Sequence, residues 1–126
     1  MIIRGICCLI PNQPNMSSNI DVISVVDKFL EHTRLFIFCN GGNNKTYISS
    51  ADWMTRNLEN RVEVTCPVLD QNISKNLNEI FDIYWKDNVK SRLVNSLKNN
   101  EYRSREESKF RYKEKIYEFH LKEIEK

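Results

Sequence analysis

A nearly continuous apolar run over residues 2–10, interrupted only by Arg4 and Gly5, constrains the fold more than any other stretch of this sequence. Runs of this kind are typical of strands buried on both faces, as in the parallel or mixed sheets of α/β proteins. The prolines at positions 11 and 14 end the strand. We therefore expect a buried strand at the start of the sheet.

The next segment predicts a helix that crosses over to a second strand. Its apolar residues recur at helical spacing between the capping cluster at 17–19 and His32. A short apolar strand at 35–38 follows, so that strand, crossover helix and strand succeed one another. The apolar positions of the expected helix are Val22, Ile23, Val26, Phe29 and Leu30.

The rest of the chain predicts a hairpin, a further strand and two amphipathic helices. Strands at 35–38 and 46–49 flank a turn at 40–44 that is rich in glycine and asparagine. A short helix or turn at 50–54, a half-exposed strand at 61–66, a helix at 73–97 and a helix from about Arg105 follow. We expect an α/β fold in one domain, residues 1–126, with a mixed β/α core at 1–66 and a mainly helical part at 67–126.

Charge and cysteine content limit the kinds of ligand site and the cellular compartment that the sequence predicts. The net charge is +2, and residues 1–66 contain six basic and six acidic side chains, so a polyanion site there must be a local pocket. The tail beyond Asn99 mixes both signs, which is typical of a solvated helix and not of a nucleic-acid interface. We expect no signal peptide or membrane span, and four reduced cysteines in the core of a cytoplasmic protein.

His32 is the principal candidate for chemistry, because it lies at the edge where α/β folds usually place ligands. Histidines exchange protons near neutral pH and donate hydrogen bonds to phosphate. Arg34 follows two residues later, and in an extended chain both side chains point to the same face. We interpret the pair as a place to hold phosphoryl groups.

Arg4 is conspicuous in an apolar strand, because its guanidinium must find an anion or emerge at the strand end. One interpretation is an internal salt bridge to Asp27 or Asp52. The other is a cationic clamp that shares a phosphate chain with His32. The sequence leaves both open.

Ser50 and Asp52, with Ser49, are candidates for a supporting role. They can orient the imidazole or bind phosphate oxygens, or they can cap the helix that Trp53 enters. Arg61, at the expected strand start, is a further phosphate candidate. The glycines at 41 and 42 do not form a phosphate loop, because the Lys-Ser/Thr ending is missing.

Four motifs keep the order and spacing of one known family, in a match that runs up to Leu97. They are Ile3-Arg4-Gly5-Ile6-Cys7-Cys8-Leu9, Val25-Val26-Asp27-Lys28-Phe29-Leu30-Glu31-His32, Asn40-Gly41-Gly42 and Ser49-Ser50-Ala51-Asp52-Trp53-Met54-Thr55-Arg56-Asn57. With these motifs the chain resembles the carboxy-terminal end of bacterial type 1 polyphosphate kinase, which has the phospholipase D-like fold.

The resemblance implies an enzyme that reversibly moves the terminal phosphate of ATP onto polyphosphate through a phosphohistidine. It implies that Arg4 and His32 contact phosphates, with His32 protonating the departing oxygen or holding the phosphates. Arg34 and Arg61 are expected as secondary contacts. ATP, ADP and polyphosphate are the implied substrates, and Mg²⁺ is implied for the full enzyme at a site outside this chain.

The resemblance also implies partners, because the phosphorylated histidine and the amino-terminal regions of the family precede the matched segment. We therefore expect this chain to form half of an active site and to be inactive by itself. The full enzyme is expected in the cytoplasm, and whether it associates with a membrane stays open. The alternatives are a non-catalytic phosphate-binding or oligomerisation module, and a dimeric phosphodiesterase. The phospholipase D motif His-x-Lys is His32-x-Arg34 here, which disfavours the diesterase. A strand edge or apolar patch left open by the absent regions predicts a homo-oligomer.

Overall fold

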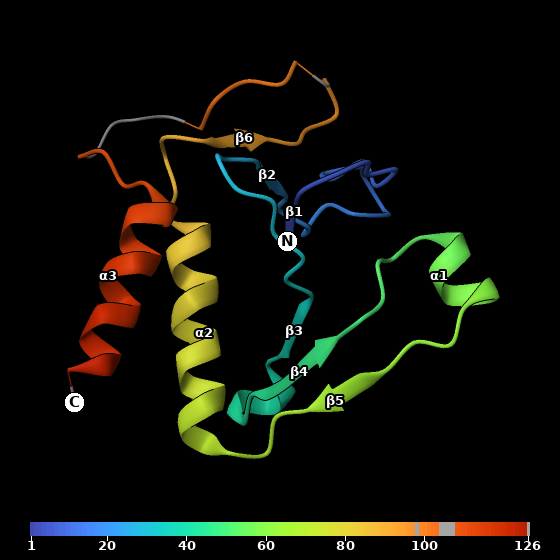
Figure 1. Cartoon of the computed structure of the whole chain (residues 1–126). Helices are drawn as coiled ribbons and strands as arrows, with labels where there is room; N and C mark the ends of the chain where they lie inside the picture. The colour runs from blue at the N-terminus through green and yellow to red at the C-terminus, as the bar shows by residue number, and fades with distance from the viewer. Residues whose placement is uncertain (98, 104–107, 126) are drawn as a thin grey trace. The chain divides into compact units, whose positions relative to one another are not determined.

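The computed structural model describes residues 1–97, 99–103 and 108–125. The chain divides into two compact units, one made of residues 1–29 and 82–126 and the other of residues 30–81. Each unit has a three-stranded sheet of its own. Figure 1 labels the elements, which are β1 (Ile2–Ile3), β2 (Ile23–Val25), β3 (Leu35–Phe38), η1 (Asn40–Gly42), β4 (Lys45–Ser49), α1 (Thr55–Asn60), β5 (Thr65–Pro67), α2 (Gln71–Trp85), β6 (Ser91–Leu93) and α3 (Tyr112–Ile124).

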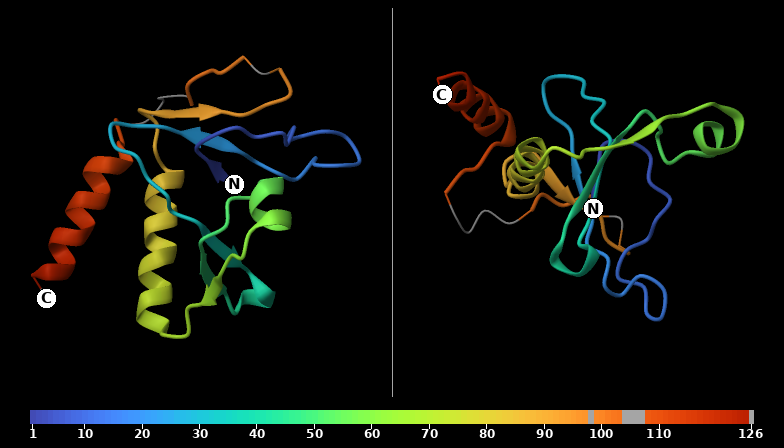
Figure 2. Two further views of the ribbon diagram at one scale, coloured as in Figure 1. Left: turned by 45° about the vertical axis from the view of Figure 1, so that its right-hand side comes forward. Right: turned by 90° about the horizontal axis from the view of Figure 1, so that it is seen from below.

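The sheet of the first unit has the order β1-β2-β6, with β1 parallel and β6 antiparallel to β2. Its small core consists of Ile23 and Val25 of β2 together with Tyr112 of α3. The Tyr112 ring lies 4.5 Å from the ring of Tyr84, measured between centroids. Both views in Figure 2 show β2 beside β6. Partly buried residues around this core are Ile2, Ile83, Tyr84, Trp85 and Ile116.

Two expectations for this unit were wrong. The strand expected over 2–10 ends at Ile3, and Ile6 is 91% exposed. No helix forms between β1 and β3; the segment expected to be helical contains strand β2 instead. Valine and isoleucine at 22, 23, 25 and 26 favour a strand because their branched side chains restrict helical rotamers.

The helix expected over 73–97 ends at Trp85, and Leu93 lies in strand β6. Asp87 explains the stop, because its carboxylate accepts hydrogen bonds from the backbone N–H groups of Val89, Lys90 and Ser91. A side chain that binds nearby backbone donors in this way competes with helical hydrogen bonds. The other Asp87 carboxylate oxygen accepts the N–H of Tyr112 and thereby fixes the start of α3.

The second C-terminal helix is α3, which begins at Tyr112 and not near Arg105. Residues 104–107 lie outside the described residues, and 108–111 are not helical. Two C-terminal helices are present as expected, but both are shorter, and strand β6 lies between them instead of preceding them. Over the residues that the structure describes, we find no helix with the length and apolar character needed to cross a membrane.

The second unit contains the expected hairpin. β3 pairs with β4 antiparallel, and β4 pairs with β5 in the same way. Gly41 and Gly42 in the turn have φ values of 66° and 93°, which side chains rarely tolerate. The first part of α2 joins β4 through a hydrogen bond of 2.8 Å between the hydroxyls of Thr46 and Ser74.

The strand expected at 61–66 is shorter and displaced, because β5 begins at Thr65 and includes Pro67. Arg61 does not start a strand but follows the last residue of α1. The cysteines are free thiols as expected, but they are not core residues. Cys7 is half-buried, and Cys8, Cys39 and Cys66 are exposed.

Candidate functional site

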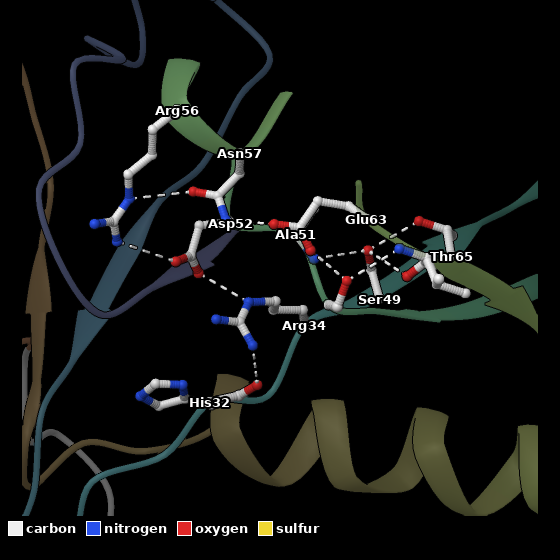
Figure 3. A network of polar contacts seen from close by, with 11 residues as sticks. His32, Arg34, Ser49, Ala51, Asp52, Arg56, Asn57, Glu63 and Thr65 are labelled. Carbon is white, nitrogen blue, oxygen red and sulfur yellow. Dashed lines mark hydrogen bonds and ion pairs between the residues drawn. The ribbon is translucent and has the colours of Figure 1, made fainter. Parts of the chain in front are cut away.

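Most of the predicted site residues gather in the second unit, around the Asp52 carboxylate. This carboxylate lies in the turn between β4 and α1, and Arg34 lies just before β3. The backbone N–H of Ser49 donates to the Arg34 carbonyl over 3.0 Å, so the hairpin pairing itself brings these two segments together. Figure 3 shows the resulting network of polar contacts.

Asp52 binds two guanidinium groups. Arg34 Nε donates to its Oδ1 over 2.8 Å, and Arg56 Nη2 lies 3.9 Å from its Oδ2. The hydrogen bond from Arg34 is the main cause that lowers the pKa of Asp52, and the positive charge of Arg56 acts in the same direction. The same hydrogen bond raises the pKa of Arg34. The carboxylate therefore stays ionised and fixes Arg34, while Arg56 approaches it as an exposed side chain.

His32 is exposed, and the network holds its backbone instead of its ring. Arg34 Nη1 donates to the His32 carbonyl over 3.1 Å. Figure 3 shows the imidazole pointing away from these contacts. In the described part of the chain no hydrogen bond engages the ring, which leaves its nitrogens available to a ligand.

Ser50 belongs to a second layer of the network. Its hydroxyl donates to the Glu63 carboxylate and accepts the N–H of Val64. The Asn57 amide, which is buried, donates to the other Glu63 oxygen over 2.7 Å. These bonds lower the pKa of Glu63, the bond from Ser50 most of all.

The helix-capping role considered for the serines and Asp52 was wrong. Met54 occupies the cap position of α1, and no side chain caps the helix there. Ser49 instead accepts the N–H of Ala51 over 3.1 Å, and its hydroxyl bonds with that of Thr65 over 2.9 Å. Ser49 and Ser50 thus join the end of β4 to the start of β5 and to the residues just before it.

Arg4 and Arg61 are not part of this network. Arg4 lies in the first unit, where its Nη2 donates to the Phe29 carbonyl over 3.0 Å. The two carboxylates considered as its partners bind other cations, Asp27 with Arg111 and Asp52 with Arg34. Arg61 is exposed and helps to lower the pKa of Glu63. Convergence of Arg4 and His32 on one phosphate stays a prediction.

Sequence reasoning missed three members of the network, Arg56, Asn57 and Glu63. The spacing of Asp52 and Arg56 was a usable sign, because carboxylates and cations four residues apart often meet on a helix. Nothing local marks Glu63, since its partners Ser50 and Asn57 reach it only after the chain has folded back.

The network does not fit a metal ion. In residues 1–97, 99–103 and 108–125 no three His, Cys, Asp or Glu side chains gather as ligands. The Asp52 carboxylate, the natural oxygen donor here, is already bound by Arg34 and approached by Arg56. What the arrangement can do is present an imidazole, the fixed guanidinium of Arg34 and the exposed guanidinium of Arg56 to an anion such as phosphate.

Comparison with known proteins points to one family. The sequence profile described as "Polyphosphate kinase C-terminal domain 2" matches residues 1–113. The polyphosphate kinase of Escherichia coli K12 is 48% identical over 102 residues, which are 81% of this chain and 15% of that protein. The enzyme of Vibrio parahaemolyticus is 46% identical over 127 residues, covering 100% of this chain and 18% of that protein.

A solved structure agrees with these relatives. The crystal structure of polyphosphate kinase from Porphyromonas gingivalis matches 98% of this chain with a TM-score of 0.93 and 44% identity. The match confirms the mixed α/β architecture. This chain spans only 19% of that chain, and less than a fifth of the two relatives above.

Proposed function

Because the chain belongs to the polyphosphate kinase C-terminal domain family, we propose that it supplies phosphate contacts for the reversible transfer of the terminal phosphate of ATP to polyphosphate. In this proposal the phosphohistidine of the reaction lies outside these residues, in the regions that the longer relatives add. The chain by itself then forms half of an active site, and ATP and polyphosphate are its ligands in the cytoplasm.

The observation that carries the proposal is the exposed imidazole of His32, whose backbone is bound by the Arg34 guanidinium that Asp52 holds in place, with the exposed Arg56 guanidinium near the same carboxylate. When the bond between the terminal phosphorus of ATP and its bridging oxygen breaks, negative charge develops on that oxygen. His32 donates a proton or a hydrogen bond to the departing oxygen, and the phosphorus bonds to the histidine nitrogen elsewhere in the enzyme. ADP leaves with the bridging oxygen.

Arg34 holds the backbone of His32, and Arg34 and Arg56 add positive charge to this part of the site. Arg34 binds both the His32 carbonyl and the Asp52 carboxylate. Arg4 joins them in the proposal as a phosphate contact from the first unit, and Arg61 as a weaker one. Ser50 and Asp52 keep a supporting role, since they hold the segments that carry the cations.

A chimera tests the proposal. The matching 102 residues of the Escherichia coli enzyme are replaced by this chain, and formation of polyphosphate from ATP is measured. We expect the chimera to be active and the change His32→Ala to lower its rate by at least about a hundredfold, as expected for loss of a general acid. Arg4→Ala should weaken the rate and the apparent affinity for ATP together.

Lys75→Ala provides the control, because Lys75 is exposed on α2 and belongs to no part of the network. A folded chimera without activity would overturn the proposal, as would a His32→Ala chimera that works as fast as its parent. Thermal unfolding of each chimera shows whether loss of activity reflects loss of structure.

One observation favours a second candidate function, an oligomerisation module. Several large apolar side chains are exposed, with Ile6 at 91% and Val62 at 99%. Such side chains mark surfaces that another chain or another region can cover. A chain that associates with itself and gives an inactive chimera would favour this candidate.

A further inference from the structure

Alternation along the sheet of the first unit gives it two different faces. Successive strand residues point to opposite faces. Ile23 and Val25 of β2 and Ser91 of β6 are buried, and the two β2 residues pack with Tyr112 of α3. Ser24 pairs directly with Arg92 across the two strands, so these side chains share the opposite face.

A hollow of about 350 Å³ lies on this opposite face. Its lining follows the alternation of the two strands: two members lie in β2 or directly after it, two lie in β6 or directly before it, and the other two come from the segment that bridges to β6. We call it the outer-face pocket. Its lining residues are Ser24, Val26, Lys90, Arg92, Asn100 and Tyr102.

The outer-face pocket carries two cations and, among the described residues that line it, no carboxylate. The positive charge of Lys90 helps to lower the pKa of the Asp27 carboxyl. Arg111 already binds both Asp27 oxygens, over 2.7 and 2.9 Å. Arg92 lies in β6 and Lys90 two residues before it, and both line the pocket, so their like charges repel each other until an anion binds.

Arg92 is held ready for such an anion. Its guanidinium carbon lies 3.9 Å from the centroid of the Tyr102 ring. Its Nη1 donates to the Asn100 carbonyl over 2.6 Å, and a bridge pairs Arg92 with Tyr102. A planar cation fixed in this way loses little freedom when it binds phosphate oxygens.

We propose that the outer-face pocket is a second anion site, which binds a chain of inorganic phosphate groups. Two cations, the Ser24 hydroxyl and the Asn100 amide offer donors to phosphate oxygens. A nucleotide or a nucleic acid would need a ring on which to stack its base. Among the described residues of the lining, Tyr102 alone is aromatic, and Arg92 covers its ring.

The choice of polyphosphate as the natural ligand rests on the function proposed above, whereas the existence of an anion site does not. In this view the pocket holds one part of the polymer while another part of it reacts. Retention of a polymer at a second site keeps its concentration high near the active site between successive transfers.

Titration calorimetry of the chain with tripolyphosphate and with long-chain polyphosphate tests the inference. We expect Lys90→Gln to weaken polyphosphate binding about tenfold, the loss of one charge-assisted hydrogen bond. The dependence of log affinity on log salt should become shallower by about one. Lys122→Gln is the matched control, because Lys122 lies in the last turn of α3 and does not line the pocket.

Backbone amide resonances supply a measurement that needs no variant. Tripolyphosphate should shift the amide signals of Ser24, Lys90 and Arg92 in the unaltered chain. Equal losses for Lys90→Gln and Lys122→Gln, or unshifted signals at these three residues, would overturn the inference. A single-stranded oligonucleotide that binds there as tightly as polyphosphate would overturn the assignment to phosphate chains.

The two proposals fail separately. If the chimera is active and Lys90→Gln binds polyphosphate like its parent, the outer-face pocket is rejected while the proposed function stands. If the chimera is folded and inactive while Lys90→Gln alone weakens binding, the phosphate-chain site stands and the kinase function falls.

Discussion

The Asp27 carboxylate joins two segments of the first unit that lie 84 residues apart in the sequence. Its side chain is only 2% exposed, and the Arg111 guanidinium binds it through two nitrogens. Bidentate pairs of this kind are directional as well as strong. Asp27 therefore fixes where the chain enters α3, which begins at the next residue after Arg111.

The Asp27 pair predicts a loss of stability in acid. The Arg111 hydrogen bond holds the pKa of Asp27 below its ordinary value. The pair therefore contributes its full share to the free energy of unfolding above about pH 4, and that share is lost as the pH falls through the lowered pKa.

We expect Asp27→Asn to reduce the free energy of unfolding by about 2 kcal/mol at pH 7, and by much less near pH 2. Urea unfolding at the two pH values measures the difference. Glu118→Gln is the control, because Glu118 is exposed and pairs with the half-buried Lys115 at the surface, and the change should cost less than about 0.5 kcal/mol. Equal losses for Asp27→Asn at both pH values would contradict the account.

The candidate site shows what single residues disclose in a sequence. His32, Arg34, Ser50 and Asp52 were all predicted, and all lie in the second unit. Their pairings could not be predicted, because Arg34 binds Asp52 only after the β3–β4 hairpin has formed. Local spacing indicated which residue types carry chemistry, and long-range contacts decided which of them share a partner.

Turn chemistry was the most reliable guide to the secondary-structure elements. The glycines at 41 and 42 indicated the hairpin, and the structure places both at positive φ. Periodicity was less reliable for short apolar segments, which fit a strand as well as a helix. For that reason the sequence predicted residues 22–26 as part of a helix. In the structure alternate residues of β2 are buried, which is the burial pattern of a strand.

The end of α2 depends on one buried carboxylate, and this gives a prediction for that element. Asp87 has no exposed surface and accepts four backbone N–H groups, those of residues 89, 90, 91 and 112. We expect Asp87→Ala to reduce the free energy of unfolding by about 3 kcal/mol or more, because these donors lose their acceptor.

Urea unfolding measures this loss, and Asp82→Ala is the matched control because Asp82 is exposed on α2. Asp82→Ala should change stability by less than about 0.5 kcal/mol. Similar losses for the two variants would show that Asp87 is not what ends the helix.

For the whole molecule, the buried apolar surface of the described residues is small in comparison with the exposed apolar surface. Only five hydrophobic residues are buried, among the residues described, while many large ones are exposed. The apolar segment after β1 illustrates this, since Ile6 is 91% exposed although the sequence around it looks like a buried strand. The pattern fits a chain that matches less than a fifth of its relatives' length.

Exposed apolar surface predicts that the chain associates with itself. We expect the sedimentation coefficient to rise with concentration and a hydrophobic dye to bind. Ile6→Gln should reduce both effects if the segment after β1 carries the contact, whereas Val62→Gln, in the other unit, should not. A monodisperse monomer that binds no dye would contradict the prediction.

The alternation of β6 also limits the insertions and deletions that this part of the chain tolerates. Adding one residue between Asn88 and Lys90 would turn Lys90 and Arg92 toward the packed side of the sheet and bring Ser91 outward. Adding two residues would restore the original faces. Variants of different length that keep both faces must therefore gain or lose residues there in pairs, unless a bulge absorbs the odd one.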